Sequence, residues 1–87
     1  GSPLIEGGWR YDAAVKRVVL DLTQSHPGNA YRLPLEIGLT IDGTPKIEKI
    51  ELTQKQQRFE IAADKEPATV TLDPNTWVLM ETRFGKR

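Results

Sequence analysis

Cysteine is missing from the chain, and this absence excludes three kinds of site at once. There can be no disulfide framework, no zinc site built on thiolates and no cysteine nucleophile. His26 is the only histidine, whereas a catalytic zinc site needs three protein ligands and a structural site needs four. We therefore expect no metal and no cofactor in this chain.

An excess of either charge is missing too, with 12 Lys and Arg against 12 Asp and Glu. A nucleic-acid-binding protein needs a basic stripe, and a membrane-surface helix needs a basic face, so neither partner is expected. No apolar run approaches the roughly 20 residues that cross a bilayer. Nucleic acid and membranes are therefore not expected as partners, and the isolated chain is expected to be a monomer.

The length of 87 residues predicts one small domain. Gly1 and Ser2 are interpreted as a cloning scar at residues 1–2, so the chain is expected to be a piece of a longer protein. Residues 3–84 are predicted to be a single β-sandwich domain. Residues 85–87 are predicted to be a basic tail, in which Lys86 and Arg87, with Arg83 before them, form a solvated end.

The main pattern in the sequence is the alternation of apolar and polar residues with a period of two. In residues 33–41, five apolar side chains alternate with Pro34, Glu36, Gly38 and Thr40, a pattern that fits a half-buried strand and not a helix. Because proline cannot donate to a ladder, Pro34 predicts an edge position or a strand end that leaves the pairing early.

Six further segments give a seven-stranded antiparallel β-sandwich of Ig-like type, an all-β fold. The second strand is predicted at residues 17–24, the fourth at 47–52 and the seventh at 77–82; the first contains Ile5, Trp9 and Tyr11 in phase. The fifth strand is marked by Phe59 and Ile61, and the sixth by Ala68, Val70 and Leu72. The predicted core consists of Val18, Leu20, Leu22, Leu35, Ile37, Leu39, Ile50, Phe59, Ile61, Val70 and Leu72.

Three local features predict departures from regular pairing. Gly7 and Gly8 predict a bulge or a bend in the first strand. Asp42-Gly43 is a strong hairpin signal, although Pro45 predicts a loop longer than two residues. Ile47 is out of phase with the apolar residues that follow it, which predicts an irregularity in the fourth strand.

No set of residues predicts an active site. His26, with Ser25 and Thr23 nearby, lacks an orienting acid and an oxyanion hole, and is expected to be a solvated loop residue. Asp73 and Asn75 are two possible calcium ligands where six or more oxygens are needed; both fit a turn at residues 73–76 instead. The aromatic residues are expected in the core more than on a sugar-binding platform; they are Trp9, Tyr11, Tyr31 and Trp77. The predicted catalytic, cofactor-binding and metal-binding sets are therefore all empty.

An ordered set of segments resembles the small Ig-like β-sandwich domain that follows the catalytic domain in bacterial zinc aminopeptidases of the aminopeptidase N family. The segments are PLIEGGWRYD (3–12), VVLDLTQ (18–24), YRLPLEIGLTI (31–41), QRFEI (57–61) and VTLDPNTWVLM (70–80). That family carries its chemistry on an H-E-x-x-H helix and a G-x-M-x-N loop. One histidine excludes the first motif here, and Val78 stands where the second needs glycine before Met80.

The resemblance implies a non-catalytic accessory module, not an enzyme, that packs against and spaces the catalytic domain of the same parent chain. Zinc is then expected only in that catalytic domain. The apolar run at residues 77–80 follows a predicted hairpin turn. Either its strand is central and covered on both faces, or Trp77 or Val78 forms, beside Phe84, an exposed patch that docks on a neighbouring domain. The alternative is an independent Ig-like binding module for carbohydrate or protein, which the fold alone does not separate from the first.

Overall fold

The computed structural model describes residues 2–74 and 80–87, and strands are the only regular elements in these ranges. The all-β prediction is confirmed. The strands are β1 (Leu4–Asp12), β2 (Arg17–Gln24), β3 (Leu33–Ile41), β4 (Thr44–Leu52), β5 (Gln56–Ala62), β6 (Thr69–Pro74) and β7 (Glu81–Lys86).

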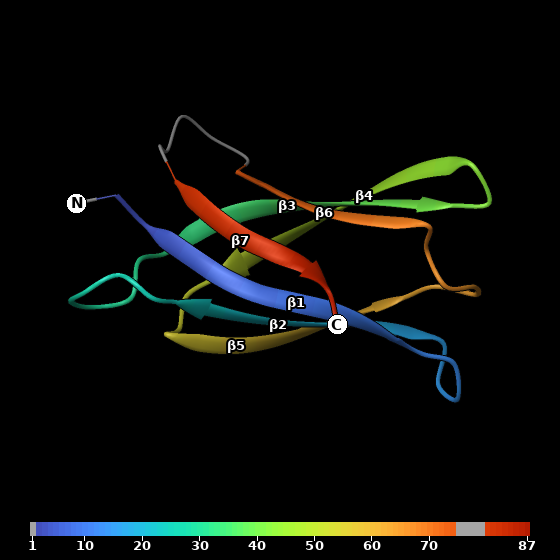
Figure 1. Ribbon diagram of the computed structural model, residues 1–87, viewed down its shortest axis with the longest axis horizontal. Helices are drawn as coiled ribbons and strands as arrows, with labels where there is room; N and C mark the ends of the chain where they lie inside the picture. Colours follow the sequence, from blue (N-terminus) through green and yellow to red (C-terminus); the bar gives the residue numbers. More distant parts are fainter. Residues whose placement is uncertain (1, 75–79) are drawn as a thin grey trace.

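Two sheets pack face to face (Figure 1). One has four strands in the order β5-β2-β1-β7, and the other has three in the order β4-β3-β6. Alternate residues of each strand point into the space between the sheets, as the period-two pattern requires. The architecture is therefore a two-sheet β-sandwich.

The core lies between the sheets and contains most of the residues predicted for it. Nine of the predicted core residues are buried, while Ile50 and Phe59 are partly buried and pack against the others. Trp9, expected in the core as an aromatic residue, is buried as well, and sequence reasoning left out Ile5, Leu33, Leu52 and Ala63, which are also buried. Each fully buried Leu or Ile side chain contributes roughly 1.5–3 kcal/mol to the free energy of unfolding.

The prediction of a wholly antiparallel sandwich is wrong at one pair, because β1 and β7 run parallel, with Ile5 opposite Thr82 and Gly7 opposite Phe84. As a result, β6 and β7 belong to different sheets and are not a hairpin. The connection between them passes from one sheet to the other. Residues 75–79, which include Trp77 and Val78 of the predicted docking patch, lie outside the described residues.

The turn between β3 and β4 is tighter than predicted. Ile41 pairs with Thr44, so only Asp42 and Gly43 lie between the strands. Their φ values are 50° and 75°, and two positive φ angles are the requirement of a type I′ turn. Pro45 does not lengthen the turn, because it already lies in β4, opposite Thr40.

Neither the bulge predicted in the first strand nor the irregularity predicted in the fourth is present. Pairing is continuous along β1 and β2, without a bulge at Gly7 or Gly8. It is continuous along β4 as well; Ile47 is out of phase because it points to the solvent side, where 63% of it is exposed.

Pro34 lies in the central strand of its sheet and not at an edge. On the β4 side the pairing continues through Pro34, which lies opposite Glu51, to Leu33. On the β6 side the residues that follow Pro74 lie outside the described part of the chain.

The last strand extends further than predicted. Met80 precedes β7, and the strand runs to Lys86, into the segment predicted to be a solvated basic tail. The backbone N–H of Arg87 continues the pairing by donating to the carbonyl of Trp9 at 2.9 Å. Residues 85–87 are therefore part of the sheet edge.

Candidate docking surface

The outer faces of the two sheets differ in charge. On the four-stranded sheet, outward-pointing charges form ion pairs between Arg58 and Asp21 at 2.8 Å and between Arg83 and Glu81 at 3.7 Å. Arg10 lies 3.8 Å from Asp12 on the same sheet. A face of this kind is suited to contact with water.

The outer face of the three-stranded sheet has an uncharged half, which we call the neutral patch. It consists of Gly38, Thr40, Pro45, Ile47, Thr69 and Thr71. Gly38 lies at its centre, with Ile47 opposite on β4 and Thr71 opposite on β6. A side chain at position 38 would meet the Thr71 hydroxyl, since a Cβ there would lie 2.7 Å from its oxygen. The centre of the patch therefore carries no side chain, and Ile47 is exposed beside it.

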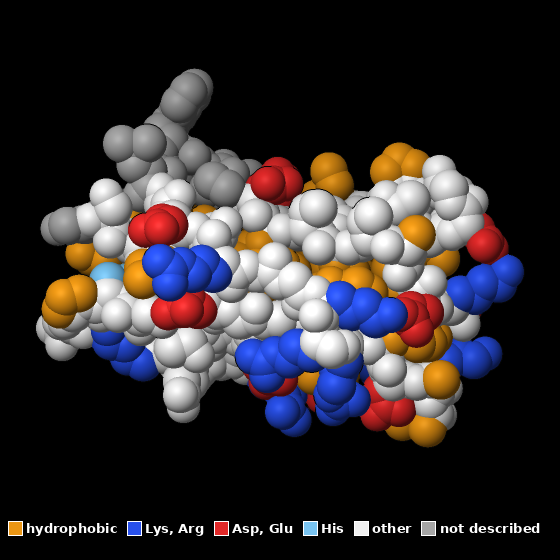
Figure 2. All heavy atoms as spheres, in the orientation of Figure 1, with side chains coloured by type: hydrophobic (Ala, Val, Ile, Leu, Met, Phe, Trp, Pro, Cys, Tyr) orange, Lys and Arg blue, Asp and Glu red, His pale blue; other side chains and the backbone are white. Residues whose placement is uncertain are grey.

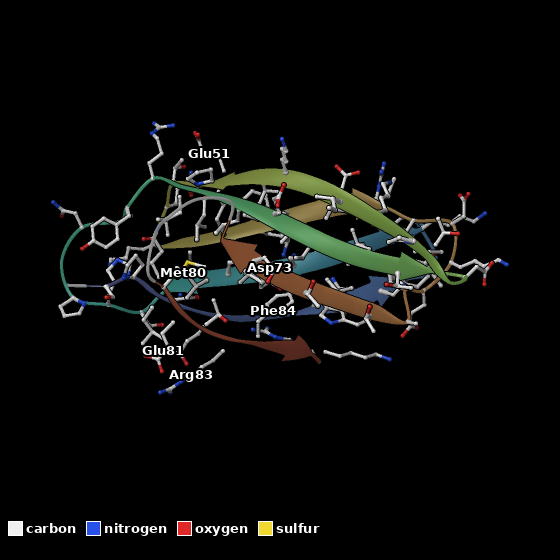
Figure 3. The ribbon with its side chains drawn as sticks, turned by 90° about the horizontal axis from the view of Figure 1, so that it is seen from above. Glu51, Asp73, Met80, Glu81, Arg83 and Phe84 are labelled. Atoms are coloured by element: carbon white, nitrogen blue, oxygen red, sulfur yellow. The ribbon has the colours of Figure 1, made fainter. Side chains whose placement is uncertain are left out.

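The other half of this face is charged, and its charges are poorly matched. Glu36 on β3 lies opposite Asp73 on β6, and like charges directly opposite each other destabilise a sheet. Neither carboxylate forms an ion pair with a described residue, although Lys49 lies across from Glu36 on β4. Figure 3 looks onto this face and labels Asp73 and Glu51 at the ends of their strands. Glu51 is paired with Arg32, so Glu36 and Asp73 are the two carboxylates of this half that form no ion pair with a described residue.

Phe84 does not form the exposed patch that was predicted for it. In Figure 3 its ring points toward β6, while Glu81 and Arg83 point away from the molecule. Phe84 is partly buried and packs against the core. Lys86 closes the same side of the sandwich, because its Nζ lies 2.6 Å from Glu66 and 5.7 Å from the centre of the Trp9 ring.

His26 is buried, with 7% of its surface exposed, and the prediction of a solvated loop residue is wrong. Its Nδ1 accepts a hydrogen bond from the backbone N–H of Leu4 at 3.0 Å. Its Nε2 is buried and has no partner among the described residues. The ring lies 4.6 Å from that of Tyr31. His26 therefore ties the start of β1 to the loop that follows β2.

The other predicted candidates do not converge. Thr23 lies on the outer face of β2, and Ser25 is exposed beside His26, whose Nδ1 is already occupied by Leu4. Asp73 belongs to β6, and Asn75 lies outside the described residues. In the described part of the chain, no three His, Cys, Asp or Glu side chains lie close enough together to hold a metal ion.

The aromatic residues are also dispersed. Trp9 is in the core, and the Tyr11 hydroxyl donates to the carbonyl of Ala63 at 2.6 Å. Tyr31 is 39% exposed and lies at the His26 end of the molecule. Trp77 lies outside the described residues. The three described aromatics therefore do not share one platform.

The comparisons with known proteins give no family. No protein-family model matches the chain, and no curated protein matches it. Within residues 2–74 and 80–87, no helix has the length and apolar character needed to span a membrane.

Proposed function

We propose that the chain is a non-catalytic accessory domain of a zinc aminopeptidase of the aminopeptidase N family, and that it docks on the catalytic domain of the same parent chain. The family assignment rests on the ordered sequence segments described above. The docking role rests on one structural observation, the neutral patch, which lies opposite an ion-paired outer face.

The proposal specifies the partner surface. An apolar area on the catalytic domain covers Ile47, which is 63% exposed here. A lysine or arginine beside it lies between Glu36 and Asp73, where it offsets the repulsion of the two carboxylates. An apolar centre with a polar margin is the usual anatomy of such an interface.

Within this proposal the sandwich is Ig-like with two strands exchanged. In the constant-type order the fourth strand joins the first, second and fifth, and the seventh joins the third and sixth. Here the fourth strand lies beside the third and the seventh beside the first. The zinc ion and the catalytic groups are supplied by the parent's catalytic domain, and the isolated domain is a monomer.

Two experiments test the assignment. The parent reading frame is expected to encode H-E-x-x-H upstream of this domain; a glycosidase or adhesin sequence there would favour the alternative, an independent binding module for carbohydrate or protein. In addition, calorimetry and an aminopeptidase assay on the isolated chain are expected to show neither zinc binding nor cleavage. Stoichiometric zinc binding at micromolar concentration would contradict the accessory role.

A further inference from the structure

A hollow of about 420 Å³ lies on the outer face of the four-stranded sheet, opposite the neutral patch. It is formed between β2, β5 and the residue that follows β7. Its lining residues are Asp21, Leu22, Thr23, Gln56, Gln57, Arg58 and Arg87. In Figure 2, Lys and Arg side chains gather around the C-terminal end of β7, with Asp and Glu among them.

Asp21 holds one of the two arginines in this hollow. Arg58 Nε donates to Asp21 Oδ1 at 2.8 Å, and its Nη2 lies 3.5 Å from Oδ2. The hydrogen bond to Asp21 and the charge of its carboxylate raise the pKa of Arg58 above its ordinary value. Because Asp21 takes one side of the guanidinium, the N–H groups of Nη1 remain available for another acceptor.

Gly8 positions the second arginine. Gly8 is buried although it points outward, because the Arg87 side chain lies across it. A Cβ at position 8 would lie 2.6 Å from Arg87 Nε and 2.7 Å from its Cγ. Arg87 forms no ion pair with a described residue. The absence of a side chain at Gly8 thus lets Arg87 lie flat against the sheet, at the hollow that Arg58 also lines.

We infer that this hollow is a binding site for a carboxylate. Its lining side chains include two guanidinium groups and one carboxylate, that of Asp21; when the α-carboxylate of Arg87 is amidated, one positive charge is left over. A planar carboxylate matches the fork of a guanidinium. The Thr23 hydroxyl and the Gln56 amide at the margin supply neutral donors. This site is independent of the docking proposal, because it lies on the other outer face.

Two sources supply this chemistry, a free dicarboxylic acid and an acidic side chain of a peptide. The test records the Nε–Hε signals of Arg58 and Arg87 by NMR while glutarate is added at constant ionic strength. The chain carries an amidated C-terminus, so that the α-carboxylate of Arg87 does not compete. A second arm replaces glutarate by a short glutamate peptide, and glutaramide and the glutamine peptide are the neutral controls.

We expect saturable shifts of both arginine signals with glutarate and none with glutaramide. Arg87→Gln should weaken binding by about tenfold, because a charge-assisted hydrogen bond is lost. Gly8→Ala should do the same by displacing Arg87, whereas a Cβ at Gly85 meets nothing within 4 Å and Gly85→Ala should bind normally. Tighter binding of the glutamate peptide than of glutarate identifies a peptide side chain as the source, tighter binding of glutarate identifies the free acid, and equal binding means that the carboxylate group alone is recognised.

The inference is overturned if no saturable shift appears with either carboxylate probe, or if Arg87→Gln binds as well as the parent sequence does. Arg87 is exposed at the surface, so this variant is expected to keep the fold, which a far-UV spectrum verifies. It therefore gives a decisive result even if Gly8→Ala disturbs β7, whose Gly85 carbonyl lies 2.9 Å from the Cβ position at Gly8.

Discussion

Glu36 and Asp73 lie directly opposite each other on β3 and β6, and both carboxylates are on the outer face of the three-stranded sheet. The pairing leaves two negative charges side by side without an ion-pair partner in the described part of the chain. Such an arrangement destabilises the isolated domain and would be relieved by a cation from outside.

The first prediction concerns this pair. Asp73→Asn should raise the free energy of unfolding of the isolated domain by roughly 0.2–1 kcal/mol, because the repulsion across the strands is removed. Urea unfolding measures the change. In the proposed parent enzyme the same substitution should be neutral or destabilising, since the basic side chain that we propose there then loses its carboxylate. Destabilisation of the isolated domain would show that Asp73 has a stabilising partner within it.

The second prediction separates the core from the surface with two isoleucines. Ile37 is fully buried, whereas Ile47 on the neighbouring strand is 63% exposed. Ile37→Ala should lower the free energy of unfolding by about 2–5 kcal/mol, through lost burial and a cavity. Ile47→Ala should change it by less than about 0.5 kcal/mol. Similar losses for the two variants in urea unfolding would contradict the assignment of the faces.

The third prediction concerns His26. Replacing it by Phe keeps a ring but removes the acceptor of the Leu4 N–H, and an unsatisfied buried donor costs about 1–3 kcal/mol. Hydrogen exchange should therefore accelerate at Leu4 while the middle of β1 stays protected. His26→Asn, whose carbonyl oxygen can replace Nδ1 as the acceptor, should restore part of the protection. Unchanged exchange at Leu4 in the Phe variant would show that the hydrogen bond to His26 does not protect this N–H.

The fourth prediction is a pH dependence at the β3–β4 turn. Lys65 Nζ lies 2.6 Å from Asp42 Oδ2, and the hydrogen bond and charge of Asp42 raise the pKa of Lys65. A raised pKa in the folded state means that the stabilisation is fully present below the unfolded-state pKa and is lost as the pH rises through the folded-state value. Lys65→Met should therefore reduce stability equally at about pH 7 and pH 8; the reduction should begin to shrink at about pH 10.4, the ordinary lysine pKa, and vanish only above the raised folded-state pKa.

Lys65→Met in an Asp42→Asn background is the control for the fourth prediction, because the ion pair is already absent there. In that background the effect of Lys65→Met on urea unfolding should not depend on pH in this way. A Lys65 effect that persists at the highest pH would mean that it comes from packing of the side chain and not from its charge.

The alternation of apolar and polar residues along the sequence predicted much of the fold, because successive side chains of a strand point to opposite faces of the sheet. The structure confirms the bounds of two strands, at residues 17–24 and 33–41, and places most of the predicted core residues between the sheets. The parallel pairing of β1 with β7 was missed, because it joins the two ends of the chain and no local pattern encodes it. The assumption that neighbouring strands pair made β6 and β7 a hairpin, which is wrong.

The surface features were harder to predict. The neutral patch requires three strands in register, which brings Ile47, Gly38 and Thr71 into one row. The position of Arg87 over Gly8 depends on the same unpredicted parallel pair. The burial of His26 depends on a contact with Leu4, 22 residues away in the sequence. Ile47 alone gave a sequence signal of the neutral patch. It is out of phase with Ile50 and Leu52, and an apolar residue on the outer face of a strand indicates a surface that contacts another molecule.

The most direct test of the docking role is the melting temperature of the full-length parent carrying Ile47→Asp, compared with that of the isolated domain carrying the same change. The proposal predicts a lower melting temperature in the parent and almost none of this loss in the isolated domain, since Ile47 is exposed there. Ala62→Asp, an exposed position on the opposite outer face, is the matched control and should affect neither. An equal change of melting temperature in the parent and the isolated domain with Ile47→Asp would contradict docking through the neutral patch.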